Sequence, residues 1–169
     1  MVAHYQNFFI ASAGASAAIL GLLVVAVSVV NADDSDPTTR ERRTVLAGSA
    51  FVALVDIFFV SIVALTGGPV VFAVSSLAMA GVGLLTTRDL IGRARRAGNF
   101  SQGFRTRKLN LTFAVISVGG YAVQLGISVA LLANTGSAAL QRALVLVIVA
   151  LYGSALGRAW EVTGITRRR

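Results

Sequence analysis

Five long apolar stretches, separated by short polar segments, dominate the chain. An α-helix needs about 20 residues to cross roughly 30 Å of hydrocarbon, and the stretches are close to that length. They occupy residues 8–30, 44–65, 69–87, 111–133 and 140–158. The fifth reaches spanning length only if Arg142 extends its side chain toward one interface and Trp160 lies at the other. The pattern predicts an all-α, polytopic membrane helix bundle that forms one domain over residues 1–169.

The composition excludes an ordinary soluble enzyme, a coiled coil and a disordered chain. Of 169 residues, 56% are hydrophobic and only 13% are charged, against about 25% charged in a typical soluble domain. The mean hydropathy is +0.78. Cysteine is absent, so disulfides and thiol chemistry are excluded. The net charge of +8 would suggest a nucleic-acid partner in a soluble protein. Here the basic residues lie between apolar stretches, so we expect no nucleic acid.

The distribution of basic residues predicts the orientation of the chain. Fourteen of the fifteen lie in the segments 31–43 and 88–110 and in the tail from Arg158, and the fifteenth is Arg142. Because basic segments remain in the cytoplasm, this alternation predicts five spans with the N-terminus outside and the C-terminus inside. The localisation expected is the cytoplasmic membrane.

The basic cytoplasmic segment 88–110 is expected to bind anionic lipid headgroups. Its predicted anchoring residues are Arg93, Arg95, Arg96, Arg105, Arg107 and Lys108. Residues 88–96 are also expected to continue the third helix as an amphipathic segment.

Asp56 is the only acidic or basic residue well inside an apolar stretch. It lies about 18 Å along the second helix, near the centre of the bilayer. A charged aspartate there costs on the order of 2.5–3.5 kcal/mol, so it needs a partner, a proton or water. One interpretation is a proton or cation site. The other is a neutral carboxyl that forms a hydrogen bond between helices. With no basic residue expected at that depth, an ion pair within the chain is not expected.

Matching residues by depth in the bilayer places other polar side chains level with Asp56. Gln124 and Tyr121 share one face of the fourth helix, and Ser75 and Ser76 lie near the middle of the third. These residues are predicted to form one polar cluster at the midplane. A purely local helix contact is the alternative for Gln124 and Tyr121.

Small residues predict close helix packing. They are concentrated in the first helix, at Gly14, Ala18 and Gly21, and recur in the fifth, at Gly153 and Gly157. Small residues allow backbones to approach where lipid offers no hydrophobic drive. The contacts are expected either within one chain or between copies in a homo-oligomer.

No catalytic constellation is present. The chain has one histidine, no pairing of histidine with a nucleophile and an acid, and no glycine-rich phosphate loop. We therefore expect neither enzymatic activity nor a cofactor nor a metal. The specific function predicted is a small homo-oligomeric channel or proton/cation conductor that uses Asp56. The alternative is an accessory or scaffold membrane protein, with a membrane-protein partner, in which Asp56 is only an interhelical hydrogen-bonding residue.

The N-terminal stretch carries a resemblance. An aromatic pair, Phe8-Phe9, precedes the run Gly14-Ala15-Ser16-Ala17-Ala18, which is followed by Gly21-Leu22 and a stretch of Val, Ala and Ser. This order is similar to the opening of a group of small bacterial multi-pass membrane proteins. The resemblance implies a bacterial cytoplasmic-membrane protein and brings no activity or site residues with it.

Overall fold

The chain folds into long α-helices that run alternately up and down a single bundle. The computed structural model describes residues 5–33, 37–96 and 104–162. Within these ranges the helices are α1 (Gln6–Asp33), α2 (Pro37–Thr66), α3 (Pro69–Arg96), α4 (Phe104–Ala133) and α5 (Ala138–Val162). Each contains a stretch long and apolar enough to cross a membrane. The predicted all-α class with five helices, each a candidate membrane span, is therefore confirmed.

Every helix extends beyond the apolar stretch that predicted it. The fifth, for example, ends at Val162, beyond the expected 158, and α3 continues through residues 88–96 as predicted. Backbone hydrogen bonds within a helix are satisfied at any depth, so a helix need not end where the hydrocarbon ends. The charged flanks are thus helical, and the lengths of the helices exceed those of the spans.

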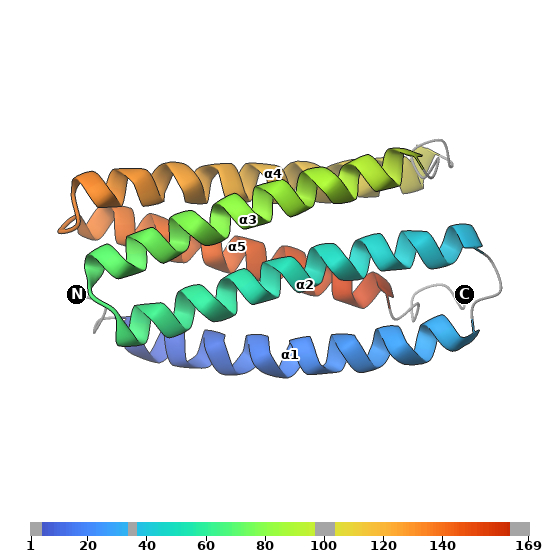
Figure 1. Ribbon diagram of the computed structural model, residues 1–169, viewed down its shortest axis with the longest axis horizontal. Helices are drawn as coiled ribbons and strands as arrows, with labels where there is room; N and C mark the ends of the chain where they lie inside the picture. Colours follow the sequence, from blue (N-terminus) through green and yellow to red (C-terminus); the bar gives the residue numbers. More distant parts are fainter. Residues whose placement is uncertain (1–4, 34–36, 97–103, 163–169) are drawn as a thin grey trace.

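The two short connections that the structure describes are tight turns with residues typical of turns and helix caps. Gly67 and Gly68 separate α2 from α3, and a Cβ at Gly67 would lie 2.9 Å from the Val63 carbonyl oxygen. Glycine avoids that clash. Between α4 and α5, the Ser137 hydroxyl accepts a hydrogen bond from the Leu140 amide at 3.4 Å, which caps the start of α5. Both turns lie at one end of the bundle, as the alternation requires (Figure 1).

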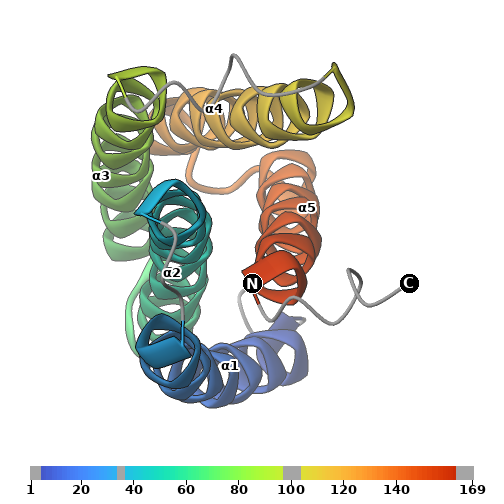
Figure 2. The same cartoon turned by 90° about the vertical axis from the view of Figure 1, so that its right-hand side faces the viewer.

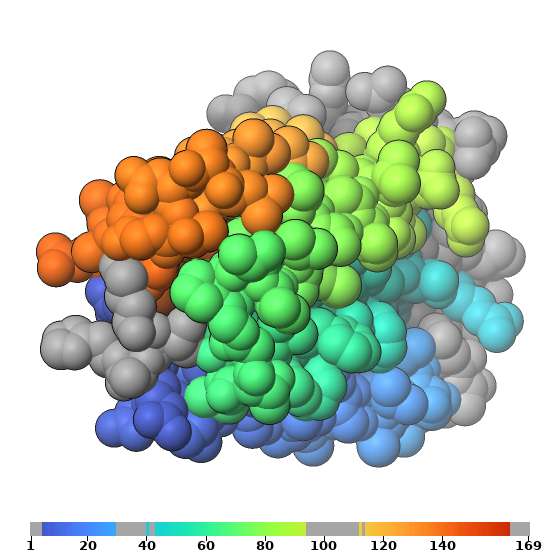
Figure 3. Space-filling model, turned by 60° about the vertical axis from the view of Figure 1, so that its left-hand side comes forward, coloured from blue at the N-terminus to red at the C-terminus, as the bar shows by residue number. Residues whose placement is uncertain are grey.

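Helix α2 is at the centre of the arrangement. It packs against α1, α3 and α5, whereas α4 packs against α3 and α5 (Figure 2). Helix α1 lies at the edge, and only 11% of its span is buried, against 50% for α2. The space-filling view shows α3 and α4 in contact, with α1 at the opposite edge of that face (Figure 3).

The expected orientation can be tested with introduced cysteines, because the chain has none of its own. A membrane-impermeant thiol reagent applied from outside should label Val2→Cys and Ser137→Cys but not Ser101→Cys. All three should be labelled once the membrane is permeabilised, which serves as the control. External labelling of the Ser101→Cys variant in intact cells would contradict the predicted orientation.

Candidate functional site

The face of α4 that packs into the bundle is polar over most of its length. Its buried residues with described side chains are Ser117, Tyr121, Gln124 and Ser128, followed by Leu131, and none of the four polar ones is more than 1% exposed. Their spacing of four, three and four residues aligns them on one side of a helix. Exposed positions such as Val115 and Val123 are apolar. Helix α4 is therefore polar toward the protein and apolar toward lipid.

Asp56 of α2 is hydrogen-bonded to this face. The Gln124 amide nitrogen Nε2 donates to Asp56 Oδ1 at 2.9 Å, and both side chains are 0% exposed. The same nitrogen lies 3.4 Å from the Ser76 carbonyl and from its hydroxyl oxygen. One amide thereby links α2, α3 and α4 at the level of the carboxyl.

Ser76 extends the hydrogen bonding along the bundle, whereas Ser75 does not take part. The Ser128 hydroxyl donates to Ser76 Oγ at 2.9 Å, and it also lies 2.7 Å from the Gln124 carbonyl oxygen. Ser75 instead donates to the Phe72 carbonyl of its own helix at 3.1 Å. Neighbours on a helix point about 100° apart, so adjacent serines cannot both face the same site.

Tyr121 lies one turn from Gln124 and packs against α3. Its ring covers Gly83, where a Cβ would come within 2.6 Å of the ring atom Cδ1. The phenol oxygen is buried and has no hydrogen-bond partner among the described residues. Gly83 was not anticipated from the sequence, and the absence of its side chain makes room for this ring.

Arg158 corrects one sequence-based expectation. We expected it in the basic tail, but it lies inside α5 and is only 1% exposed. Its Nη1 donates to the Ser117 hydroxyl at 2.8 Å, and its Nε donates to the Ser154 carbonyl at 3.1 Å. The helix continues past the apolar stretch, so residue 158 remains packed against α4. A basic residue is therefore buried in the same bundle as Asp56.

We call these residues the polar row. It consists of Asp56, Ser76, Ser117, Tyr121, Gln124, Ser128 and Arg158, from four helices. Among the described residues, Asp56 Oδ2, Gln124 Oε1 and Arg158 Nη2 also lack a hydrogen-bond partner. The polar row therefore contains both acceptors and donors that make no hydrogen bond to the described residues.

The predicted packing residues lie mainly on the outside. A Cβ added at Gly14, Gly21 or Gly153 would have no atom within 4 Å, and Ala18 is exposed. Gly157 is partly buried. The face of α1 that carries Gly14, Ala18 and Gly21 thus makes no close contact with the part of the chain that the structure describes.

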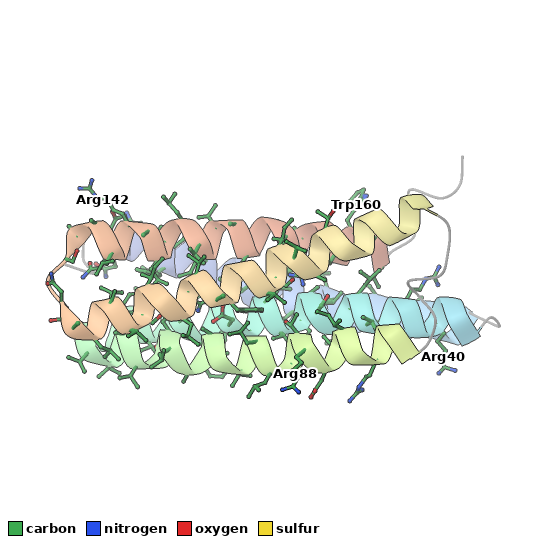
Figure 4. All side chains as sticks on the ribbon, turned by 90° about the horizontal axis from the view of Figure 1, so that it is seen from above. Arg40, Arg88, Arg142 and Trp160 are labelled. Carbon is green, nitrogen blue, oxygen red and sulfur yellow. The ribbon has the colours of Figure 1, made fainter. Side chains whose placement is uncertain are left out.

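Residues expected at the membrane interfaces lie toward the ends of the bundle. Arg142 is exposed near one end, and Trp160, 57% exposed, lies toward the other (Figure 4). Arg93 is exposed on the last turns of α3. The side chains of the other predicted anchoring residues, Arg95, Arg96, Arg105, Arg107 and Lys108, lie outside the part of the chain that the structure describes.

Comparison with known proteins identifies no relative. No protein-family model, no curated protein and no solved structure matches this chain. The resemblance of the N-terminal stretch to small bacterial membrane proteins therefore identifies no family. What stands is a multi-pass membrane protein with a buried Asp56–Gln124 hydrogen bond between helices.

Gln124→Leu should lower the free energy of unfolding modestly. The variant removes the amide donor to Asp56, and hydrogen bonds between membrane helices contribute about 0.6 kcal/mol on average and about 1.7 at most. Unfolding by sodium dodecyl sulfate in mixed micelles would measure the loss. Val123→Leu, at a position that is 52% exposed on the same helix, is the matched control and should have no effect. Equal stabilities for the two variants would argue against the hydrogen bond.

Proposed function

We propose that this chain is a non-enzymatic accessory or scaffold membrane protein, in which Asp56 holds helices together. The observation that carries the proposal is the enclosure of Asp56 within a single chain. Its carboxyl is 0% exposed and accepts a hydrogen bond from Gln124 across the helix interface. Polar contacts of this kind are the usual means of joining helices in lipid.

The enclosure favours a scaffold over an oligomeric channel. A channel between copies of the chain would need Asp56 on a surface that another copy, or water, can reach. Gln124, Ser76 and Ser128 are also 0% exposed, so the centre of the row faces inward throughout.

A path through one chain is also poorly supported. From Ser117 to Ser128 the row extends for about 16 Å along α4, roughly half of the hydrocarbon thickness. The next buried residue on that face is Leu131, which belongs to an apolar cluster with Leu144, Phe9 and Phe72. Large apolar side chains therefore close the row toward the end where α4 finishes.

The surface proposed for assembly is the small-residue face of α1. This helix packs mainly against α2, and its face around Gly14, Ala18 and Gly21 is open. Close approach of a helix from a second copy or from a partner protein would place backbones in contact there. We propose a homo-oligomer as the simplest assembly.

Vesicles reconstituted with the purified protein test the choice between scaffold and channel. We expect no flux of protons, Na⁺ or K⁺ above that of protein-free vesicles. An added ionophore should then release the gradient, which shows that the vesicles are sealed and the readout is sensitive. Flux that requires the unaltered protein would overturn the scaffold proposal and restore the conductor.

Gly14→Leu should disrupt self-association and leave the fold of each chain intact. The substitution adds bulk at the proposed contact, whereas nothing in the chain itself lies within 4 Å of the new Cβ. Light scattering in a mild detergent should show a smaller oligomer. Val24→Leu, at a residue further along α1 that is 53% exposed, is the control and should retain the full mass. A mass of one chain for the unaltered protein would contradict homo-oligomerisation.

A further inference from the structure

The buried guanidinium of Arg158 requires a compensating negative charge. Arginine remains protonated in proteins, and an isolated charge away from water is strongly unfavourable. The two hydrogen bonds of Arg158 go to a hydroxyl and to a backbone carbonyl, which carry no net charge. Its Nη2 is buried and has no hydrogen-bond partner among the described residues.

Asp56 is the only buried carboxyl in the part of the chain that the structure describes. The other buried polar side chains there are hydroxyls and amides, together with Arg158 itself. Both unpaired atoms belong to the same row, because Asp56 Oδ2 offers an unused acceptor and Arg158 Nη2 an unused donor. Charge balance in the core therefore points to this pair.

Helix α4 connects the two groups. Ser117 binds Arg158 and Gln124 binds Asp56, and these two residues lie seven positions apart on α4, about 10 Å along its axis. Tyr121 lies between them on the same buried face of α4. In a medium of low dielectric constant, opposite charges attract over longer distances than they do in water.

The groups that face this unit come from all four helices around it. Asp56 comes from α2, and α4 contributes Ser117, Tyr121 and Gln124. Helix α3 contributes Ser76, Gly83 and, buried on the same helix, Thr87, none of which is ionisable in the physiological range. Helix α5 contributes Arg158 and the Ser154 carbonyl, with Glu161 one turn further on and only partly buried. Asp56 is thus the one buried carboxyl of this group among the described residues.

We propose that Asp56, Tyr121 and Arg158 form a proton-binding site inside the membrane, in which the Asp56 carboxylate is the counter-charge of Arg158 and binds one proton reversibly. In the unprotonated state the core is neutral overall. On protonation, hydronium gives its proton to Asp56 Oδ2 and leaves as water, and the core acquires one positive charge. Oδ1 continues to accept from Gln124, so the helices stay joined while α5 loses its electrostatic attraction to α2. This proposal does not depend on whether the protein is a scaffold.

Infrared spectroscopy tests the charge state of Asp56 directly. Aspartate labelled with ¹³C at the side-chain carboxyl separates aspartic from glutamic acid bands. In the unaltered protein at neutral pH we expect no band from a protonated aspartic acid, and we expect one to develop reversibly on acidification and to be missing in Asp56→Asn. A protonated aspartic acid band already present at neutral pH, and missing in Asp56→Asn, would overturn the proposal.

Arg158→Met supplies the complementary test. Without the cation, a buried carboxyl prefers its neutral form, so this variant should carry the protonated band at neutral pH. Arg142→Met removes an exposed arginine from the same helix and should leave the spectrum of the unaltered protein unchanged. Identical spectra for the Arg158 variant and the unaltered protein would refute the coupling.

A double-mutant cycle provides the energetic test. Asp56→Asn alone should reduce the folding equilibrium constant by roughly a hundredfold, because it leaves a buried charge uncompensated. Adding Arg158→Met should restore most of that loss, since both charges are then gone. If the Asn variant does not fold while the double variant does, the coupling is supported. Independent, additive effects of the two substitutions would contradict it.

Discussion

Gly83→Ala should lower the free energy of unfolding by about 1–3 kcal/mol, although alanine is otherwise the better helix former. The added methyl carbon would lie 2.6 Å from Cδ1 of the Tyr121 ring, and real Cβ atoms essentially never come closer than 3.0 Å to another atom. The ring is rigid and only 1% exposed, so it has no room to move aside. Relief would require α3 and α4 to separate, which would weaken the Gln124 contacts with Ser76. Unfolding in mixed micelles would measure the loss.

Gly81→Ala is the matched control for this substitution. It lies two positions away on the same helix, and a Cβ there would meet nothing within 4 Å. We expect it to be neutral or to stabilise α3 slightly, by up to about 1 kcal/mol. The double variant Gly83→Ala, Tyr121→Leu replaces the ring with a smaller side chain. It should recover part of the stability that Gly83→Ala loses. Equal stability of the two alanine variants would show that the ring does not rest on Gly83.

The spans and the centre of the polar row could be predicted because both depend on one dimension, depth in the bilayer. The lengths of the apolar stretches predict the helices. Because successive helices run in opposite directions across the bilayer, the position of a residue along its helix then gives its depth. This calculation brought Asp56, Gln124 and Ser76 to the same level, and the structure joins them with hydrogen bonds. It could not separate Ser76 from Ser75, since adjacent residues share a depth and differ only in direction.

Direction around a helix is difficult to predict here because lipid is as apolar as a protein core. A soluble helix shows its buried side through an apolar stripe, whereas these helices are apolar on the lipid side as well. On α4 the pattern is the reverse of that in a soluble helix, because the buried face is polar. It is marked by the repeat Ser117, Tyr121, Gln124, Ser128. The full repeat includes Ser117 and Ser128, which lie on the same face of α4 as Tyr121 and Gln124 but were not in the predicted cluster.

Arg158 was missed because a basic residue after an apolar stretch usually marks the cytoplasmic end of a span. That rule treats the arginine as solvated, as exposed Arg88 is. Arg158 instead lies on the face of α5 that also buries Ile148, Leu151 and Ala155. Arg158 follows Ala155 by three positions and Leu151 by seven, and this spacing places it on the buried side of α5. This spacing was the only signal for it in the sequence.

The small residues packed between the helices are mainly alanines, and not the glycines that were predicted from the sequence to form close contacts. Gly14 and Gly153 face outward, whereas Ala50 and Ala53 of α2 and Ala155 of α5 are 0% exposed and belong to one buried cluster. Because membrane helices associate by packing, a small side chain at a contact determines how close two backbones come. Small side chains in this cluster allow the helices that share it, α2 and α5 among them, to approach closely.

Ala155→Leu should accordingly lower the free energy of unfolding by about 1–3 kcal/mol. The larger side chain would push α5 away from α2, and it would disturb the contacts of Arg158 one turn further along the helix. The same change at Ala150, an exposed position on α5, adds equal bulk toward lipid and should have little effect. Unfolding of both variants in mixed micelles, under identical conditions, gives the comparison. A loss for Ala150→Leu as large as that for Ala155→Leu would mean that α5 is oriented differently, with the polar row's arginine no longer directed at α4.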